Sequence, residues 1–172
     1  MARISIDEAG GQNVVAYLDM LAFAEGTSTS RFTRDDGYDV MVGGIDLTPN
    51  DGVDDAPKTF SSYADHPNKL ITVNTKGLKS TAAGRYQQLS RYWPAYKKLL
   101  KLPDFGPVSQ DKLAIQLIRE RRALDDVKAG RIEDAIYKCN NIWASLTGSK
   151  YGQKTWPLAT LMKVYLDKGG NL

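Results

Sequence analysis

One glutamate follows an apolar segment at a position where its carboxyl group could serve as an acid. Six of the seven residues before Glu25, in the stretch LDMLAFAEGT (residues 18–27), are apolar. On a helix, Glu25 points within about 20° of Val14 and Leu18, so it extends the buried stripe. The last turn of a helix also disfavours an anion. Burial and the helix dipole both raise the pKa of a carboxyl group, and a general acid must be protonated near neutral pH.

A plainer interpretation of Glu25 stays open at this point. The helix could fray before it, and the carboxylate would then face water or pair with an arginine such as Arg31 or Arg34. Against this, Glu25 conflicts with two local preferences at once, and such conflicts concentrate at functional sites.

The elements around this glutamate predict an α+β protein. Apolar spacing predicts a helix over residues 12–24, ending before Gly26. Alternating residues in GYDVMVGG (37–44) and NKLITVNT (68–75) predict short antiparallel strands. Helices are expected after residue 80, over residues 83–100 with a kink at Pro94, 109–130 with Ser109 as N-cap, 131–146 and 156–170. We therefore expect a mainly helical lobe and a small antiparallel β-sheet lobe flanking a cleft.

Composition excludes several classes of function. The 172 residues carry a net charge of +3 without a Lys/Arg run, so nucleic-acid binding is not expected. Cys139 is the only cysteine and His66 the only histidine, which rules out an internal disulfide and a paired-cysteine or HExxH metal site. A His-based triad would need His66, which lies in the loop-like ADHPNK. We expect no metal, no cofactor and no stable membrane association.

Six ordered segments resemble a known family. They are YLDMLAFAEGT, GYDVMVGG, YADHPNKLITVN, KSTAAGRYQQLSRYW, SQDKLAIQLIRERRAL and CNNIWASLTGSKYGQ, which cover most of residues 17–153. The chain resembles the phage-lambda-type endolysins, lysozyme-fold lytic transglycosylases that cut peptidoglycan. The resemblance implies that Glu25 is the catalytic acid and then the base. It implies cleavage between N-acetylmuramic acid and N-acetylglucosamine that leaves a 1,6-anhydro sugar.

Two alternatives remain beside the transglycosylase hypothesis. A muramidase would hydrolyse the same bond with a second carboxylate, about 5–5.5 Å away for retention or about 6.5–9.5 Å for inversion. Asp35, Asp36 and Asp39 are the candidates, and Asp39 could line the cleft or bond the backbone of a local turn. The second alternative is a wall-binding protein with a lysozyme fold and no turnover.

Four further residues are candidates for substrate binding. Tyr86 and Gln87, in GRYQ, are expected at the entry to the helix after the sheet, where Tyr86 could equally be a core residue. Tyr151 and Gln153 lie beside glycines in LTGSKYGQ, a segment suited to a flexible lip or to a plain surface loop. Trp143 and Cys139 are expected in the core.

We expect one catalytic domain over residues 1–172, with a long and mobile excursion at about 45–64 that exceeds the family pattern. The start of the chain has acids before its first apolar run, so no cleaved signal is expected. The resemblance implies synthesis in the host cytoplasm, action on peptidoglycan strands in the periplasm, and access through a holin-type permeabilising partner. Nothing in the sequence demands more than a monomer.

Overall fold

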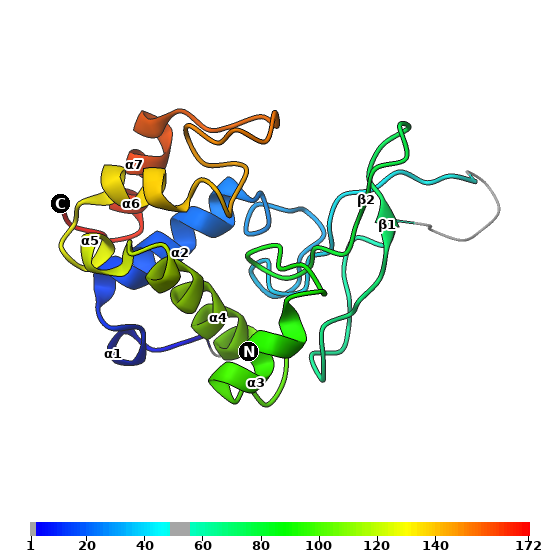
Figure 1. The fold of residues 1–172 in the computed structure, drawn as a ribbon, viewed down its shortest axis with the longest axis horizontal. Helices are drawn as coiled ribbons and strands as arrows, with labels where there is room; N and C mark the ends of the chain where they lie inside the picture. Colours follow the sequence, from blue (N-terminus) through cyan, green and yellow to red (C-terminus); the bar gives the residue numbers. More distant parts are fainter. Residues whose placement is uncertain (1–2, 49–55) are drawn as a thin grey trace. The chain divides into compact units, whose positions relative to one another are not determined.

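The computed structural model describes residues 3–48 and 56–172, which form two compact units. The helical unit comprises residues 3–26 and 111–172, and the loop unit comprises the described residues 27–48 and 56–110. The helices are α1 (Ile6–Ala9), α2 (Gln12–Ala24), α3 (Trp93–Leu100), α4 (Pro107–Glu120), α5 (Leu124–Lys128), α6 (Ile132–Cys139) and α7 (Leu158–Asp167) (Figure 1). The strands are β1 (Ile71–Thr72) and β2 (Lys79–Ser80). The boundary between the units divides α4 after its first turn.

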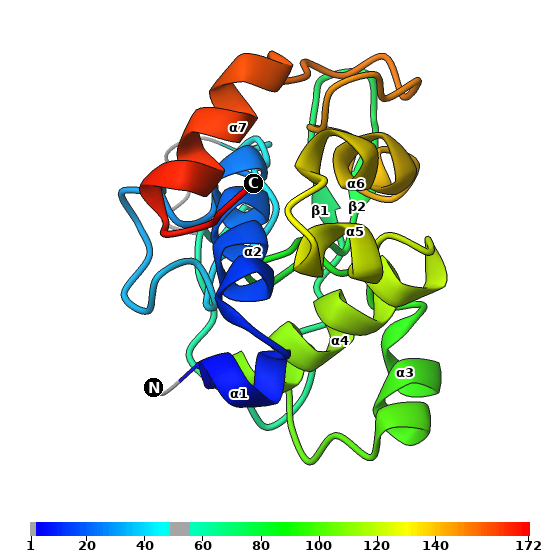
Figure 2. The same ribbon diagram turned by 90° about the vertical axis from the view of Figure 1, so that its left-hand side faces the viewer.

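Helix α2 is the centre of the helical unit, as its apolar sequence predicts. It packs against α1, α5 and α7, and α6 packs against α5 and α7 (Figure 2). Every residue from Val14 to Ala22 is buried, including Asp19, whose carboxylate pairs with Arg3 at 2.7 Å. A helix covered on all sides needs apolar residues around its whole circumference, which explains the near absence of charge. The predicted bounds of 12–24 are confirmed.

The loop unit contains much less sheet than the sequence indicates. β1 and β2 are antiparallel, with Ile71 opposite Ser80, and together make a two-stranded sheet. The predicted strand at residues 37–44 is wrong, because this segment forms only isolated bridges. Met41 N–H bonds Lys58 O at 2.9 Å, whereas Val42 N–H bonds Ala82 O at 2.9 Å. The segment makes a single bridge on each side, Val40 with Thr59 and Met41 with Ala83, and a ladder needs consecutive pairs along the same neighbour.

Three predicted helices need correction. The helix predicted over residues 131–146 is α6, which ends already at Cys139. The helix over residues 83–100 begins only at Trp93, and Pro94 lies in its first turn, where the missing N–H breaks no hydrogen bond. The helix predicted from Ser109 begins at Pro107, so Ser109 is inside α4 and its hydroxyl donates to Asp104 at 3.0 Å. Helix formation also stops between α4 and α5, where Arg122 adopts a φ of 57°.

Part of the predicted 45–64 excursion is held against the loop unit. Ala56 is fully buried and forms a small core with Met41 and Ile71. Thr59 bridges Val40, and Phe60 N–H bonds Asp39 O at 2.9 Å. Residues 49–55 of the excursion lie outside the described residues. In the part of the chain that the structure describes, no helix has the length and apolar character needed to cross a membrane.

Candidate active site

Glu25 is the residue at which α2 ends. Ala24 is the last helical residue, and Glu25 is the C-cap with helical dihedral angles (φ −74°, ψ −6°). Gly26 follows with a φ of 71°, which only glycine adopts at little cost, and its N–H bonds Phe23 O at 2.9 Å. The backbone of Glu25 is therefore fixed at the carboxyl end of the buried helix α2.

The carboxyl group of Glu25 is partly buried and accepts a hydrogen bond from Ser145 Oγ to its Oε1, at 2.5 Å. Burial raises the pKa of Glu25 above its ordinary value, and the hydrogen bond from Ser145 offsets part of that rise. Removing a carboxylate from water disfavours its charged form, whereas a hydroxyl donor favours it. The predicted direction of the shift is confirmed, and a carboxyl group of this kind can hold a proton closer to neutral pH than an exposed glutamate can.

The segment from Ser145 to Trp156 supports this end of α2, and sequence analysis did not anticipate it. Trp156 Nε1 donates to Ala24 O at 3.0 Å, and its ring packs against Phe23 with centroids 4.7 Å apart. Trp156 N–H bonds Ser145 O at 2.9 Å. Ser145 and Glu25 are 120 positions apart. No periodicity in the sequence signals such a pair.

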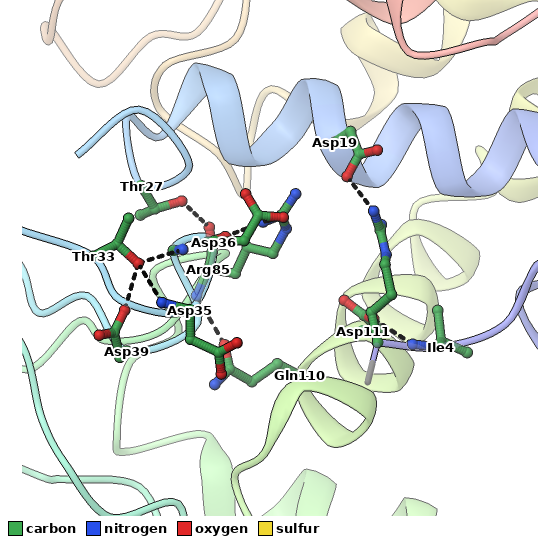
Figure 3. Close-up of polar contacts among 12 residues, drawn as sticks. Ile4, Asp19, Thr27, Thr33, Asp35, Asp36, Asp39, Arg85, Gln110 and Asp111 are labelled. Atoms are coloured by element: carbon green, nitrogen blue, oxygen red, sulfur yellow. Dashed lines mark hydrogen bonds and ion pairs between the residues drawn. The ribbon is translucent and has the colours of Figure 1, made fainter. Parts of the chain in front are cut away.

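Asp39, the candidate second carboxylate, lies in the loop unit, where both of its oxygens are engaged locally. Thr33 Oγ1 donates to Oδ1 at 2.6 Å (Figure 3). The N–H of Arg34 donates to Oδ2 at 3.0 Å. The same Thr33 hydroxyl oxygen accepts the N–H groups of Asp35 and Gly37. These are the contacts of a turn aspartate, which was the alternative interpretation of Asp39.

Tyr86 and Gln87 do not begin a helix as predicted; they occupy a tight turn closed by Ala83 and Gln88. Gln87 has a φ of 52°, is half-buried, and donates from Nε2 to Gly84 O at 3.0 Å. Tyr86 is buried and meets Tyr38 edge to face, with centroids 6.5 Å apart. Burial of this kind supports the core interpretation of Tyr86 and leaves Gln87 as the more accessible of the two.

A buried polar cluster holds this turn in place. Gln110 Oε1 accepts Arg85 N–H at 2.8 Å, and its Nε2 donates to Tyr38 O and Phe105 O. Arg85 is 2% exposed and pairs with Asp36, while Thr27 donates to Arg85 O at 2.6 Å (Figure 3). Arg85 is therefore a buried residue whose charge is balanced by an ion pair. The role of Gln110 was missed.

Tyr151 and Gln153 lie on an exposed segment of the helical unit. Tyr151 is 61% exposed and its hydroxyl donates to Asn141 O at 2.7 Å, while Gln153 is exposed. Gly152 between them has a φ of 69°. Their exposure is compatible both with a substrate-facing lip and with a plain surface loop.

The remaining candidates for chemistry have structural partners. His66 is buried, its Nδ1 accepts Asn68 N–H and its Nε2 lies 2.9 Å from Gln88 O, which fits a neutral ring protonated at Nε2. Burial lowers the pKa of His66. Cys139 and Trp143 are buried, as expected. Within residues 3–48 and 56–172, no three His, Cys, Asp or Glu side chains come together as metal ligands would.

Comparison with known proteins gives first the class and then the family. The chain matches the structure of bacteriophage lambda lysozyme complexed with a chitohexasaccharide, with a TM-score of 0.82 and 47% identity over 100% of this chain and 99% of the other. A second structure of the lysozyme from bacteriophage lambda gives a TM-score of 0.79 and 46% identity, with the same coverage. The predicted lysozyme-like α+β fold class is confirmed.

The family model described as Endolysin matches residues 15–172, and the chain belongs to this family. It is 53% identical to the endolysin of Escherichia phage P2 over 163 residues, 92% of this chain and 94% of the relative. It is 49% identical to the endolysin of Escherichia phage lambda over 158 residues, 91% of each chain. The predicted resemblance is confirmed.

Proposed function

We propose that this protein is a lytic transglycosylase with Glu25 as its single catalytic residue. Membership of the endolysin family makes it an enzyme that degrades peptidoglycan. The finer statement is that it cleaves the β-1,4 bond between N-acetylmuramic acid and N-acetylglucosamine and leaves a 1,6-anhydro product. The chitohexasaccharide bound by the lambda lysozyme supports a glycan chain as the ligand.

The observation that carries the proposal is the environment of Glu25, a partly buried carboxyl group with a raised pKa at the end of α2. Protonated Glu25 donates to the glycosidic oxygen, and the bond breaks through an oxocarbenium-like transition state. The resulting carboxylate accepts the proton of the muramic C6 hydroxyl as O6 bonds to C1. One carboxyl group thus returns to its starting state without water entering the products.

A muramidase is the competing proposal. It needs a second carboxylate, which either activates a water molecule as a general base or attacks the sugar as a nucleophile. Asp35, Asp36 and Asp39 were the candidates for that role. Asp35 accepts a hydrogen bond from Tyr63, and Asp36 pairs with Arg85. Asp39 was the one expected to line the cleft. Its two oxygens already accept hydrogen bonds from Thr33 and from the backbone of Arg34, which favours a turn-holding role over general-base catalysis. We therefore assign catalysis to Glu25 alone.

The proposal extends to substrate contacts, domain organisation and site of action. The glycan would be contacted by Gln87, Tyr151 and Gln153. Asp39 and Tyr86 would support substrate binding indirectly, by stabilising the structure of the loop unit. The two units, which the family match over residues 15–172 spans, would work as one catalytic domain and as a monomer. The enzyme would act on the wall in the periplasm after a holin-type partner opens the membrane.

The decisive experiment is mass spectrometry of purified peptidoglycan after digestion. We expect anhydro-muropeptides from the wild type, and reducing muropeptides without anhydro products would overturn the transglycosylase proposal in favour of a muramidase.

The same assay applied to Glu25→Gln tests the residue. We expect product formation to fall by about a hundredfold or more, because general-acid catalysis contributes on that order. Glu133→Gln, which changes an exposed glutamate in the first turn of α6, is the matched control and should remain active. If Glu25→Gln and the control release product equally, Glu25 is not the catalytic acid. If the wild type binds peptidoglycan but releases no product, the protein is a wall-binding module.

A further inference from the structure

The two oxygens of a glutamate side chain are chemically equivalent until the protein distinguishes them. The terminal torsion of glutamate is broad, so the carboxyl group can present either oxygen to a substrate. A general acid works only when the protonated oxygen is within hydrogen-bond reach of the atom it protonates. An acid that acts alone, as proposed for Glu25, therefore benefits from a contact that assigns each oxygen one task.

Ser145 makes such a contact. Its hydroxyl donates to Oε1 of Glu25 at 2.5 Å, and in a neutral carboxylic acid the carbonyl oxygen is the stronger acceptor, so this bond favours the proton on the other oxygen. The acidic hydrogen is consequently placed on Oε2. The two causes that shift the pKa of Glu25 are its burial and this same hydroxyl group, which act in opposite directions.

The position of Ser145 is itself fixed by the turn of α2 that bears Glu25. Ser145 O accepts Trp156 N–H at 2.9 Å, and Trp156 Nε1 donates to Ala24 O, one residue before Glu25. The Trp156 ring packs on Phe23, two residues before Glu25. The loop from Ser145 to Trp156 thus returns to the helix end it supports, and both residues hold the same helical turn.

Two further residues of this loop, Thr147 and Lys154, contact Trp156. Thr147 Oγ1 donates to Trp156 O at 2.7 Å, which ties the loop to itself without touching Glu25. The loop carries two cations, Lys150 and Lys154, and the ammonium of Lys154 lies 5.8 Å from the centre of the Trp156 ring. Thr147 therefore offers a matched control, because its hydroxyl supports the same loop but not the carboxyl group.

The geometry points to Ser145 as a positioning residue that reserves Oε1 of Glu25 for a fixed hydrogen bond and leaves Oε2 to transfer the proton. This inference rests on the proposed catalytic role of Glu25. Trp156, which bonds both Ser145 O and Ala24 O, would keep the Ser145 hydroxyl within hydrogen-bond distance of Glu25. After the proton has been donated, the Ser145 hydroxyl continues to stabilise the carboxylate until it takes up the C6 hydroxyl proton.

The test compares Ser145→Ala, Ser145→Thr and Thr147→Val on soluble peptidoglycan glycan fragments, with kcat and KM measured across pH. We expect kcat of Ser145→Ala to fall by about tenfold to a hundredfold with KM within about twofold, because orientation is lost and binding is not. The alkaline limb of the pH–rate profile should move to higher pH, since removal of the hydroxyl donor destabilises the ionised form of Glu25. Ser145→Thr keeps a hydroxyl group and should therefore have the kcat and the alkaline limb of the wild type.

Thr147→Val should leave the alkaline limb where it is in the wild type. If Ser145→Ala and Thr147→Val lose kcat equally and neither shifts the limb, the Ser145 hydroxyl is only structural and the inference is wrong. Melting curves of the variants show whether each is folded. Failure of the proposed function looks different: Glu25→Gln would then keep its activity whatever Ser145→Ala does.

Discussion

The helical unit and the loop unit achieve their order by different physical means. In the helical unit, α2 is covered by α1, α5 and α7, and its fixed structure comes from apolar packing. In the described residues of the loop unit, 27–48 and 56–110, regular structure is limited to α3, the first turn of α4, and a sheet of two-residue strands. There, buried polar side chains bond backbone groups, as Gln110 does with Arg85, Tyr38 and Phe105.

This difference has a consequence for what each unit tolerates. Apolar packing is non-directional, so a core leucine contributes through the volume it fills. A buried side chain that bonds three backbone groups contributes through geometry, and its loss leaves those groups without partners. The two units should therefore fail by different routes when one central residue is removed from each.

The largest effect is expected from Leu18→Ala in α2. Leu18 is fully buried, and its truncation should lower the free energy of unfolding by about 3–5 kcal/mol, the loss of transfer energy plus the cost of a cavity. Urea denaturation measures the loss. Leu166→Ala, which shortens a partly exposed leucine of α7, should cost less than about 1 kcal/mol. Equal losses for the two leucines would contradict the central position of α2.

A somewhat smaller effect is expected from Gln110→Ala. The change removes three hydrogen bonds and leaves buried backbone groups without partners. We expect the free energy of unfolding, measured by urea denaturation, to fall by about 2–3 kcal/mol. Gln116 lies on the same helix and bonds the exposed side chains of Glu120 and Arg119, so Gln116→Ala should stay within about 0.5 kcal/mol.

Amide hydrogen exchange sharpens the comparison between these two variants. Gln110→Ala should speed exchange at Arg85 and its neighbours in the loop unit, whereas Leu18→Ala should speed exchange along α2. If both variants lose protection uniformly in both units, the two units are not stabilised by different means.

The same contrast explains which features could be predicted from the sequence. Helix α2 was predicted with its bounds because apolar packing leaves a periodic pattern in the residues themselves. The partial burial of Glu25 followed from that pattern. The segment of residues 83–92 was predicted helical and is not, because Gln87 adopts a positive φ in a turn that Gln110 holds from 23 positions downstream.

Side-chain-to-backbone contacts across long sequence separations leave no such periodic signal. Ser145 could not be assigned to Glu25 for this reason, although the segment NNIWASLTGSKYGQ marked its neighbourhood. The sequence left two interpretations of Asp39, a residue lining the cleft or a turn aspartate, and its contacts with Thr33 and Arg34 favour the second.

The smallest effect concerns Glu25, the partly buried carboxyl group at the C-cap of α2. The folded state raises the pKa of Glu25, so the stability that its protonated form provides is present at low pH and is lost as pH rises through the folded-state value. Glu25→Gln removes this charge and keeps an oxygen that can accept the bond from Ser145. We expect the variant to melt at a higher temperature than the wild type at pH 8.

That advantage should fade as the pH falls below about 4.3, the ordinary pKa of a glutamate, because the wild-type carboxyl group is then neutral in both the folded and the unfolded chain. Glu133→Gln should show no such trend. Thermal melts at several pH values measure both. A Glu25→Gln variant that is less stable than the wild type at every pH would mean that the ionised carboxylate is well accommodated, and would remove the physical basis for a glutamate held as an acid.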